Sequence, residues 1–247
     1  MKKSIILVLI FYLLQMIGGG VATALTMFMG NDNTEGLYLS IAIALLLTDI
    51  VMAAILFRMG YLSDKKLWNP TTPVFFLGTF VAGISGIFVC DAVSALADFL
   101  PNLMEDTFDS LENSLLGIIA IVIVGPVLEE MLFRGAITTE LLKHYSPKVA
   151  IVLSALMFGV FHINPAQILT ATLMGLLLAW LFYRTRSLMP GILIHILNNG
   201  LSVYYSNTYP DANSFVDILG YFPYFLCLTA ALSLLFFSIQ KLNTTPV

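Results

Sequence analysis

The chain has 247 residues, of which 59% are hydrophobic and 11% charged, and its mean hydropathy is +0.93. Soluble domains carry about 25% charged residues, so this composition indicates an integral membrane protein. Fifteen acidic and 11 basic residues give a net charge of -4 without any basic tract, which excludes a disordered chain and a nucleic-acid-binding protein.

Eight apolar runs are long enough to cross a hydrocarbon layer about 30 Å thick, which takes about 20 helical residues. They lie near residues 4–29, 37–57, 71–97, 114–144, 147–164, 165–184, 190–206 and 214–239. We therefore predict an all-α fold, a polytopic membrane bundle of about eight transmembrane helices. A polar residue followed by proline predicts a helix start at Asn69-Pro70, Ser146-Pro147 and Asn164-Pro165.

The basic residues indicate the orientation of these spans. All of them except Arg134 fall at alternate ends of the predicted helices, and short cytoplasmic loops are enriched in Lys and Arg. We expect a multi-pass protein of the cell membrane with both termini in the cytoplasm. Lys2 and Lys3 before the first run, and Ala22-Thr23-Ala24 near its end, also fit a cleaved signal peptide, so the fate of the first span stays open.

Ionisable side chains inside spans are costly and are functional candidates. Asp49 and Asp91 lack the sequence surroundings of intramembrane aspartyl proteases, so we interpret them as packing residues or as residues near span ends. Gly83-Ile84-Ser85-Gly86 resembles a rhomboid nucleophile motif, but helix packing through Gly and Ser accounts for it better. Cys90 and Cys227 lie in apolar runs and are interpreted as structural thiols.

The strongest polar signal is Glu129-Glu130-Met-Leu-Phe-Arg134. Arg134 follows Glu130 at i,i+4, the spacing at which a charge-assisted pair forms on one face of a helix. Glu129 is rotated about 100° from Glu130 and lies outside that register. The spacing therefore predicts that Glu130 is neutralised by Arg134, while Glu129 is free to act on another group.

Two further pairs follow in order on later spans. Phe158 precedes His162 by one helical turn, and His195 precedes Asn199 by the same spacing. At 1.5 Å per residue, Glu129 and His162 lie level in a helical hairpin, roughly 22 to 24 Å above its turn. If the polar stretch 138–146 projects about 10 Å from the membrane, His195 and Asn199 reach the same level. We therefore expect the four groups to converge about 12 Å inside the cytoplasmic face.

The order Glu-Glu-x-x-x-Arg, Phe-x-x-x-His and His-x-x-x-Asn resembles the CAAX protease and bacteriocin-processing family (CPBP, or Abi), which includes the Ras-converting endoproteases. The resemblance covers Glu129 to Asn199. It implies an intramembrane endopeptidase with a cavity open to the cytosol, and relatives that mature bacteriocins or peptide pheromones or confer immunity. It also implies three parts: spans without a matched motif in 1–113, a catalytic core in 114–206, and a loop with the last span in 207–247.

Carried over by motif, the catalytic residues are Glu129, His162, His195 and Asn199, with Glu130, Arg134 and Phe158 in supporting roles. Glu129 activates a water and later protonates the leaving amine, His162 holds that water, and His195 and Asn199 donate to the oxyanion. The alternative to this metal-free mechanism is a divalent metal such as zinc bound by Glu129, His162 and His195, although no His-Glu-x-x-His motif is present. The expected partners are a peptide or membrane-protein substrate and the lipid bilayer.

Two other classes of function stay open at this point. In the first, the protein is a non-enzymatic membrane scaffold or immunity protein that binds a membrane partner. In the second, it is a transporter with Glu129, Arg134 and Asp49 on an ion pathway, although the chain has no detectable inverted repeat. Activity-dead variants that keep full cellular function would favour the scaffold, and flux into proteoliposomes would favour the transporter.

Overall fold

A computed structural model describes residues 1–29, 34–97 and 99–245, and these residues form helices without any strand. The helices, in chain order, are α1 (Lys2–Met29), α2 (Thr34–Arg58), η1 (Lys65–Trp68), α3 (Pro73–Leu96), α4 (Glu105–Glu112), α5 (Leu115–Ile118), η2 (Ile119–Val124), α6 (Gly125–Glu130), η3 (Met131–Thr138), α7 (Thr139–Leu142), α8 (Pro147–Phe161), α9 (Pro165–Thr185), α10 (Met189–Thr208), α11 (Phe215–Leu219) and α12 (Tyr221–Thr244). The prediction of an all-α membrane fold is confirmed.

Six helical stretches among the described residues are long and apolar enough to span a membrane. They are Lys2–Phe28, Gly36–Arg58, Pro73–Leu96, Leu115–Leu142, Pro165–Thr185 and Tyr221–Thr244. The other two predicted spans correspond to α8, which has only 15 residues, and to α10, which carries the polar side chains of the His195 motif. All eight apolar runs are thus helical, and the count of eight spans stays a prediction.

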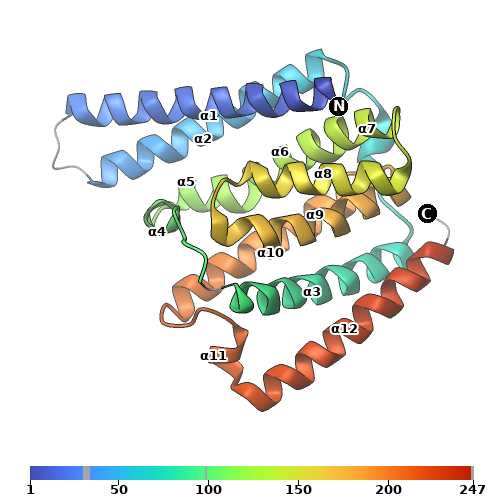
Figure 1. Cartoon of the computed structure of the whole chain (residues 1–247). Helices are drawn as coiled ribbons and strands as arrows, with labels where there is room; N and C mark the ends of the chain where they lie inside the picture. The colour runs from blue at the N-terminus through green and yellow to red at the C-terminus, as the bar shows by residue number, and fades with distance from the viewer. Residues whose placement is uncertain (30–33, 98, 246–247) are drawn as a thin grey trace.

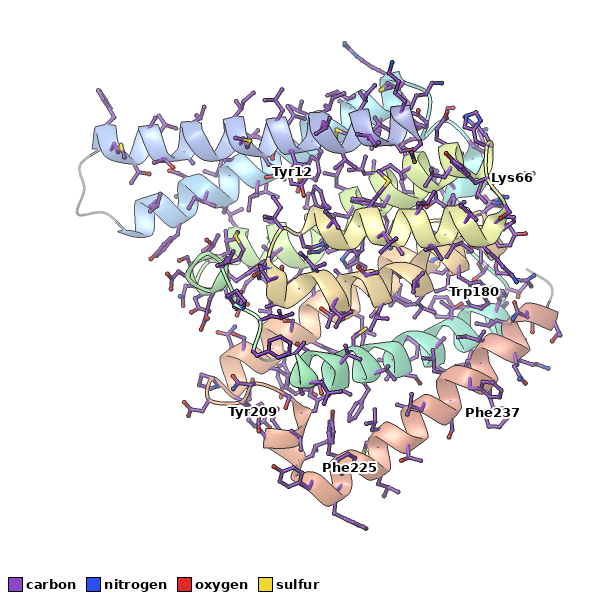
Figure 2. The ribbon with its side chains drawn as sticks, in the orientation of Figure 1. Tyr12, Lys66, Trp180, Tyr209, Phe225 and Phe237 are labelled. Atoms are coloured by element: carbon purple, nitrogen blue, oxygen red, sulfur yellow. The ribbon has the colours of Figure 1, made fainter. Side chains whose placement is uncertain are left out.

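Successive long helices run back and forth, and both chain termini lie at the same end of the bundle (Figure 1). Figure 2 shows Lys66 at that end and Tyr209 at the opposite one. Three salt bridges join Glu140 at the end of the termini to Lys3, Lys143 and His144, with N–O distances of 3.6, 2.8 and 3.6 Å. Lys3 and Lys143 thus lie at the end of the bundle that holds both termini, and the cytoplasmic orientation of this end stays a prediction.

The helix starts follow the proline signals in two of three cases. Pro147 and Pro165 open α8 and α9 after Ser146 and Asn164. The third start differs from the prediction, because α3 begins at Pro73 rather than at Pro70. Thr72 accepts a hydrogen bond from the Phe75 N–H (3.4 Å) and caps that helix.

The stretch Leu115–Leu142 is one long helix whose register changes twice. Wider π-helical turns occupy η2 and η3, on either side of the short α6 that carries Glu129 and Glu130. In η2 the N–H of Gly125 donates to the carbonyl of Ala120, five residues back. The next residue, Pro126, has no N–H, so the carbonyl of Ile121 receives no backbone donor.

Helices α9 and α10 lie between the α1–α2 pair on one side and the α3–α12 pair on the other (Figure 1). One buried cluster joins side chains of α1, α2, η3 and α8, and the other joins α3, α9, α10 and α12. Small residues bring α8 and α9 together, because a Cβ on Gly159 would lie 1.9 Å from Thr172 Oγ1. The motif residues are therefore held in the middle of the bundle.

Candidate active site

The predicted ion pair within the first motif is present and fully buried. Arg134 Nη1 lies 2.6 Å from Glu130 Oε1, and their side chains are 1% and 0% exposed. The guanidinium also stacks 4.4 Å above the Phe158 ring and reaches the Gly175 carbonyl at 3.4 Å. One oxygen of Glu130 is thus paired with Arg134, and the guanidinium of Arg134 is held in position by contacts with α8 and α9.

His195 joins this pair from α10. Its Nδ1 lies 3.1 Å from Glu130 Oε1, and because a carboxylate only accepts, this nitrogen carries the proton. The approach depends on Gly191, one turn earlier, because a Cβ there would lie 2.5 Å from Glu130 Oε2. A side chain at this position would have to displace Glu130 or α10, so Gly191 allows the close approach of α10 that brings His195 to Glu130.

Glu129 differs from Glu130 in having no hydrogen bond among the described residues. Its Oε2 is buried without a partner, and it faces His195 Nε2 at 3.6 Å, too far for a direct hydrogen bond. The Glu129 side chain keeps 20% exposure, whereas Glu130 has none. Glu130 Oε2 also lacks a partner, but it packs against Gly191. Of the two carboxylates, Glu129 is the one open to another molecule.

His162 is the residue immediately after α8. Its Nδ1 lies 2.9 Å from the Phe158 carbonyl, so Nδ1 donates and Nε2 is left as an acceptor. The Phe158 ring lies edge-on to both imidazoles, with centroid distances of 4.9 Å to His162 and 5.6 Å to His195. Phe158 therefore contacts both histidines and Arg134 at the same time.

Asn199 lies one turn after His195 but bonds elsewhere. Its Nδ2 donates to the Ile121 carbonyl at 2.9 Å, the same carbonyl that Pro126 leaves without a backbone donor. Its Oδ1 accepts from Asn198 Nδ2 at 3.1 Å. Asn199 thus supplies the missing donor to the π-helical turn beside the carboxylates. The second hydrogen of its Nδ2 group has no acceptor among the described residues.

Sequence reasoning missed two neighbours of the motifs, Tyr12 on α1 and Gly191 on α10. Neither residue belongs to a recognisable sequence pattern, because each contacts a segment far away in the chain. Tyr12 contacts the end of α8, and Gly191 contacts Glu130. Asp49 on α2 is only 5% exposed and lies within electrostatic range of Glu129, and Gln15 Nε2 is 3.5 Å from its Oδ1.

Two other polar groups lie outside this cluster. Both oxygens of Asp91 accept from the Phe215 N–H, at 3.1 and 3.3 Å. Ser85 is 3% exposed, and a Cβ on Gly83 would lie 2.6 Å from the Ile194 side chain. Both observations agree with the packing interpretation of Asp91 and of the Gly-Ser cluster.

The metal alternative requires Glu129, His162 and His195 to act as one group of ligands. Among the residues that the structure describes, no three His, Cys, Asp or Glu side chains are grouped so that they could hold a metal ion. Glu129 Oε2 lies 3.6 Å from His195 Nε2, whereas His162 hydrogen-bonds through its Nδ1 to the Phe158 carbonyl. The side chains as they lie do not fit a three-ligand centre.

Comparison with known proteins agrees with the motifs. Residues 111–201 match the family model described as "Type II CAAX prenyl endopeptidase Rce1-like". The chain is also 30% identical over 128 residues to "Putative membrane peptidase YdiL" of Bacillus subtilis (strain 168), an alignment that covers 51% of this chain and 50% of that protein.

The chain thus matches about half the length of this curated relative, and no solved structure matches it. The resemblance that the three motifs carry is confirmed by both matches. The protein is a multi-pass membrane protein, and its residues 111–201 are similar to the Rce1-like CAAX prenyl endopeptidase family.

Proposed function

We propose that this protein is an intramembrane endopeptidase that hydrolyses a peptide or membrane-protein substrate with a water activated by Glu129. The observation that carries the proposal is the contrast within one helix: Glu130 is bonded to Arg134 and His195, while Glu129 has no hydrogen bond and faces His195 Nε2. The match of residues 111–201 to a peptidase family supports the reaction class.

The proposed oxyanion role requires a proton on Nε2 of His195, because Nδ1 already donates to Glu130. Glu129 and Glu130 carry two negative charges, and Arg134 supplies only one positive charge. If Nε2 of His195 is also protonated, the four groups are neutral together, which is the cheaper state in a low-dielectric interior. The Nε2–H then points towards the space beside Glu129 Oε2, where it can donate to an oxyanion.

These side chains can then account for every proton transfer of the hydrolysis. A water held by Glu129 and by the free Nε2 of His162 attacks the scissile carbonyl carbon and gives its proton to Glu129. The tetrahedral oxyanion accepts a hydrogen bond from His195 Nε2, and the unused amide hydrogen of Asn199 adds a second donor. Glu129 returns the proton to the nitrogen as the C–N bond breaks, so no covalent enzyme intermediate is needed.

A hollow lies beside Met131, the residue after Glu130. It is lined by Ala53, Ala54, Phe57, Arg58, Leu62, Trp68 and Met131. Arg58, the last residue of α2, lies among its lining residues, and a basic residue there fits the predicted cytoplasmic side. Maturation of a small peptide, processing of a bacteriocin and immunity are the roles that the family resemblance implies for such a site.

Glu129→Gln tests the proposal, because glutamine keeps the size of the side chain but cannot take the proton. Turnover of a membrane-peptide substrate should fall by about 100-fold or more, with little change in the melting temperature of the detergent-solubilised protein. Glu105→Gln, the same change at an exposed position on α4, is the matched control and should retain wild-type turnover. Wild-type turnover by purified Glu129→Gln protein would remove the protease assignment and leave the membrane scaffold as the better function.

A further inference from the structure

Tyr12, on the first helix, contacts the end of the helix that presents His162. Its hydroxyl donates to the carbonyl of Phe161, and it also lies 3.3 Å from the carbonyl of Val160. The rings of Tyr12 and Phe161 are 4.9 Å apart, and Phe11 stacks on Phe161 at 5.2 Å with an interplanar angle of 12°. Tyr12 lies on the side of α1 that faces α8 (Figure 2).

These contacts matter because the last carbonyls of a helix have no donor within it. At the end of α8, His162 satisfies several of them itself: its backbone N–H reaches Gly159 and Val160, and its Nδ1 bonds to Phe158. The carbonyl of Phe161, directly before His162, has the Tyr12 hydroxyl as its donor. The hydrogen bonding of this helix end is therefore completed by a residue 149 positions earlier in the chain.

The chain beyond His162 is held on its other side. Ile163 adopts a left-handed conformation with φ of 57°, which is unfavourable for a β-branched residue and needs support from its surroundings. Asn164, 1% exposed, provides it: its Oδ1 accepts from the Leu103 N–H at 2.9 Å, and its Nδ2 donates to Asn102 at 2.8 Å. His162 thus lies between two anchors, and Tyr12 is the one on the α1 side.

We propose that Tyr12 is a positioning residue that fixes the end of α8 and thereby aims Nε2 of His162, so that α1 is part of the working site. The effect on turnover rests on the proposed function, whereas the effect on the geometry of His162 does not. Leu7 and Phe11, 1% and 2% exposed, pack into the same core as the motif helices, so α1 holds the hydroxyl in place by burial.

Tyr12→Phe is the test, because it keeps the ring that packs on Phe161 and removes only the donor. We expect kcat to fall roughly two- to tenfold, the change that corresponds to one net hydrogen bond, with KM little changed. Tyr221→Phe removes a hydroxyl from a 76% exposed tyrosine at the start of α12 and should leave both constants at the wild-type values.

The second readout does not depend on catalysis. The chain has three histidines, so selective ¹³C labelling of histidine rings gives three NMR signals, of which His144 serves as an internal reference. In Tyr12→Phe we expect the His162 signal to shift and broaden while the His144 signal stays in place. Tyr221→Phe should move neither signal.

The outcomes separate the two proposals. A shifted His162 signal in a chain that shows no peptidase activity would support the positioning role and overturn only the proposed function. An unmoved His162 signal would overturn the positioning role, whatever the activity. A fall in turnover that only matches a fall in the amount of folded protein would also overturn it, because Tyr12 would then serve stability alone.

Discussion

Two carboxylate sites of the bundle show how a structural acid differs from a candidate catalytic one. Both oxygens of Asp91, on α3, accept from the backbone N–H that opens α11, so this carboxylate ties α3 to a segment 124 positions later in the chain. Glu129, on α6, accepts no hydrogen bond among the described residues, although one of its oxygens is buried. Burying an unpaired acceptor costs about 1 to 3 kcal/mol, and because Glu129, unlike Glu130, is also partly exposed, another molecule can supply the missing donor.

The comparison extends to the surroundings of each group. Asp91 lies near apolar and aromatic residues of α3, α10 and α11, including Phe88 and Phe215, whose rings are 5.0 Å apart. Glu129 lies beside a second carboxylate, an arginine and an imidazole that together can be neutral. Changes at the carboxylate cluster should therefore affect turnover, while changes at Asp91 should affect only the fold.

The largest loss of stability is expected from Arg134→Ala. Removing one partner of a buried ion pair leaves Glu130 uncompensated and costs about 3 to 5 kcal/mol. Denaturation in detergent micelles measures this loss, and Arg58→Ala, at an exposed arginine, is the control that should change stability little. The double variant Glu130→Gln with Arg134→Gln should recover part of the loss. Strictly additive losses would contradict the ion-pair argument.

A smaller effect is expected where α10 passes Glu130. Gly191→Ala puts a methyl group 2.5 Å from Glu130 Oε2 and should push α10 and His195 away, at a cost of about 1 to 3 kcal/mol with a fall in turnover. Gly19→Ala is the matched control, because no atom lies within 4 Å of its added Cβ. Equal melting temperatures and equal turnover for the two variants would show that the close approach is not needed.

Asp91→Asn should reduce stability less than Gly191→Ala does, and it should leave turnover unchanged. The amide keeps the shape of the side chain but loses the charge that strengthens its bonds to the Phe215 N–H, so the free energy of unfolding should fall by about 1 to 2 kcal/mol. Turnover per folded molecule should stay at the wild-type value. A clear loss of kcat in this variant would end the distinction between the two carboxylate sites.

Much of the fold was predictable because a membrane span is a property of a contiguous run of residues. The apolar runs, the i,i+4 pair of Glu130 and Arg134, and two proline helix starts all follow from local spacing. The last span shows the limit of such patterns. The run predicted at 214–239 divides at Gly220, whose φ of 74° separates α11 from an α12 that begins at Tyr221.

The parts of the site that sequence missed depend on contacts between distant segments. The spacing to His195 predicts Asn199 as an oxyanion donor, which stays a prediction, but its bond to the Ile121 carbonyl follows from a π-helical turn that apolar periodicity cannot show. Tyr12 reaches α8 across 149 positions, and Gly191 is needed only because Glu130 lies opposite it. Spacing predicts which groups share a face, whereas their partners depend on how the helices pack.

The two carboxylate sites are expected nearer to opposite sides of the membrane. The cysteine substitutions that test this orientation should change neither stability nor turnover. The basic residues gather at the end that holds both termini, so the loop after α2 is expected in the cytoplasm and the Asp91–Phe215 region outside. In a background with Cys90 and Cys227 replaced by alanine, Asp211→Cys should react with an impermeant maleimide in intact cells. Ser63→Cys, at an exposed position, should react only after permeabilisation. Labelling of Ser63→Cys from outside would reverse the orientation, so the hollow beside Arg58 would open on the outer face and the substrate would be extracellular.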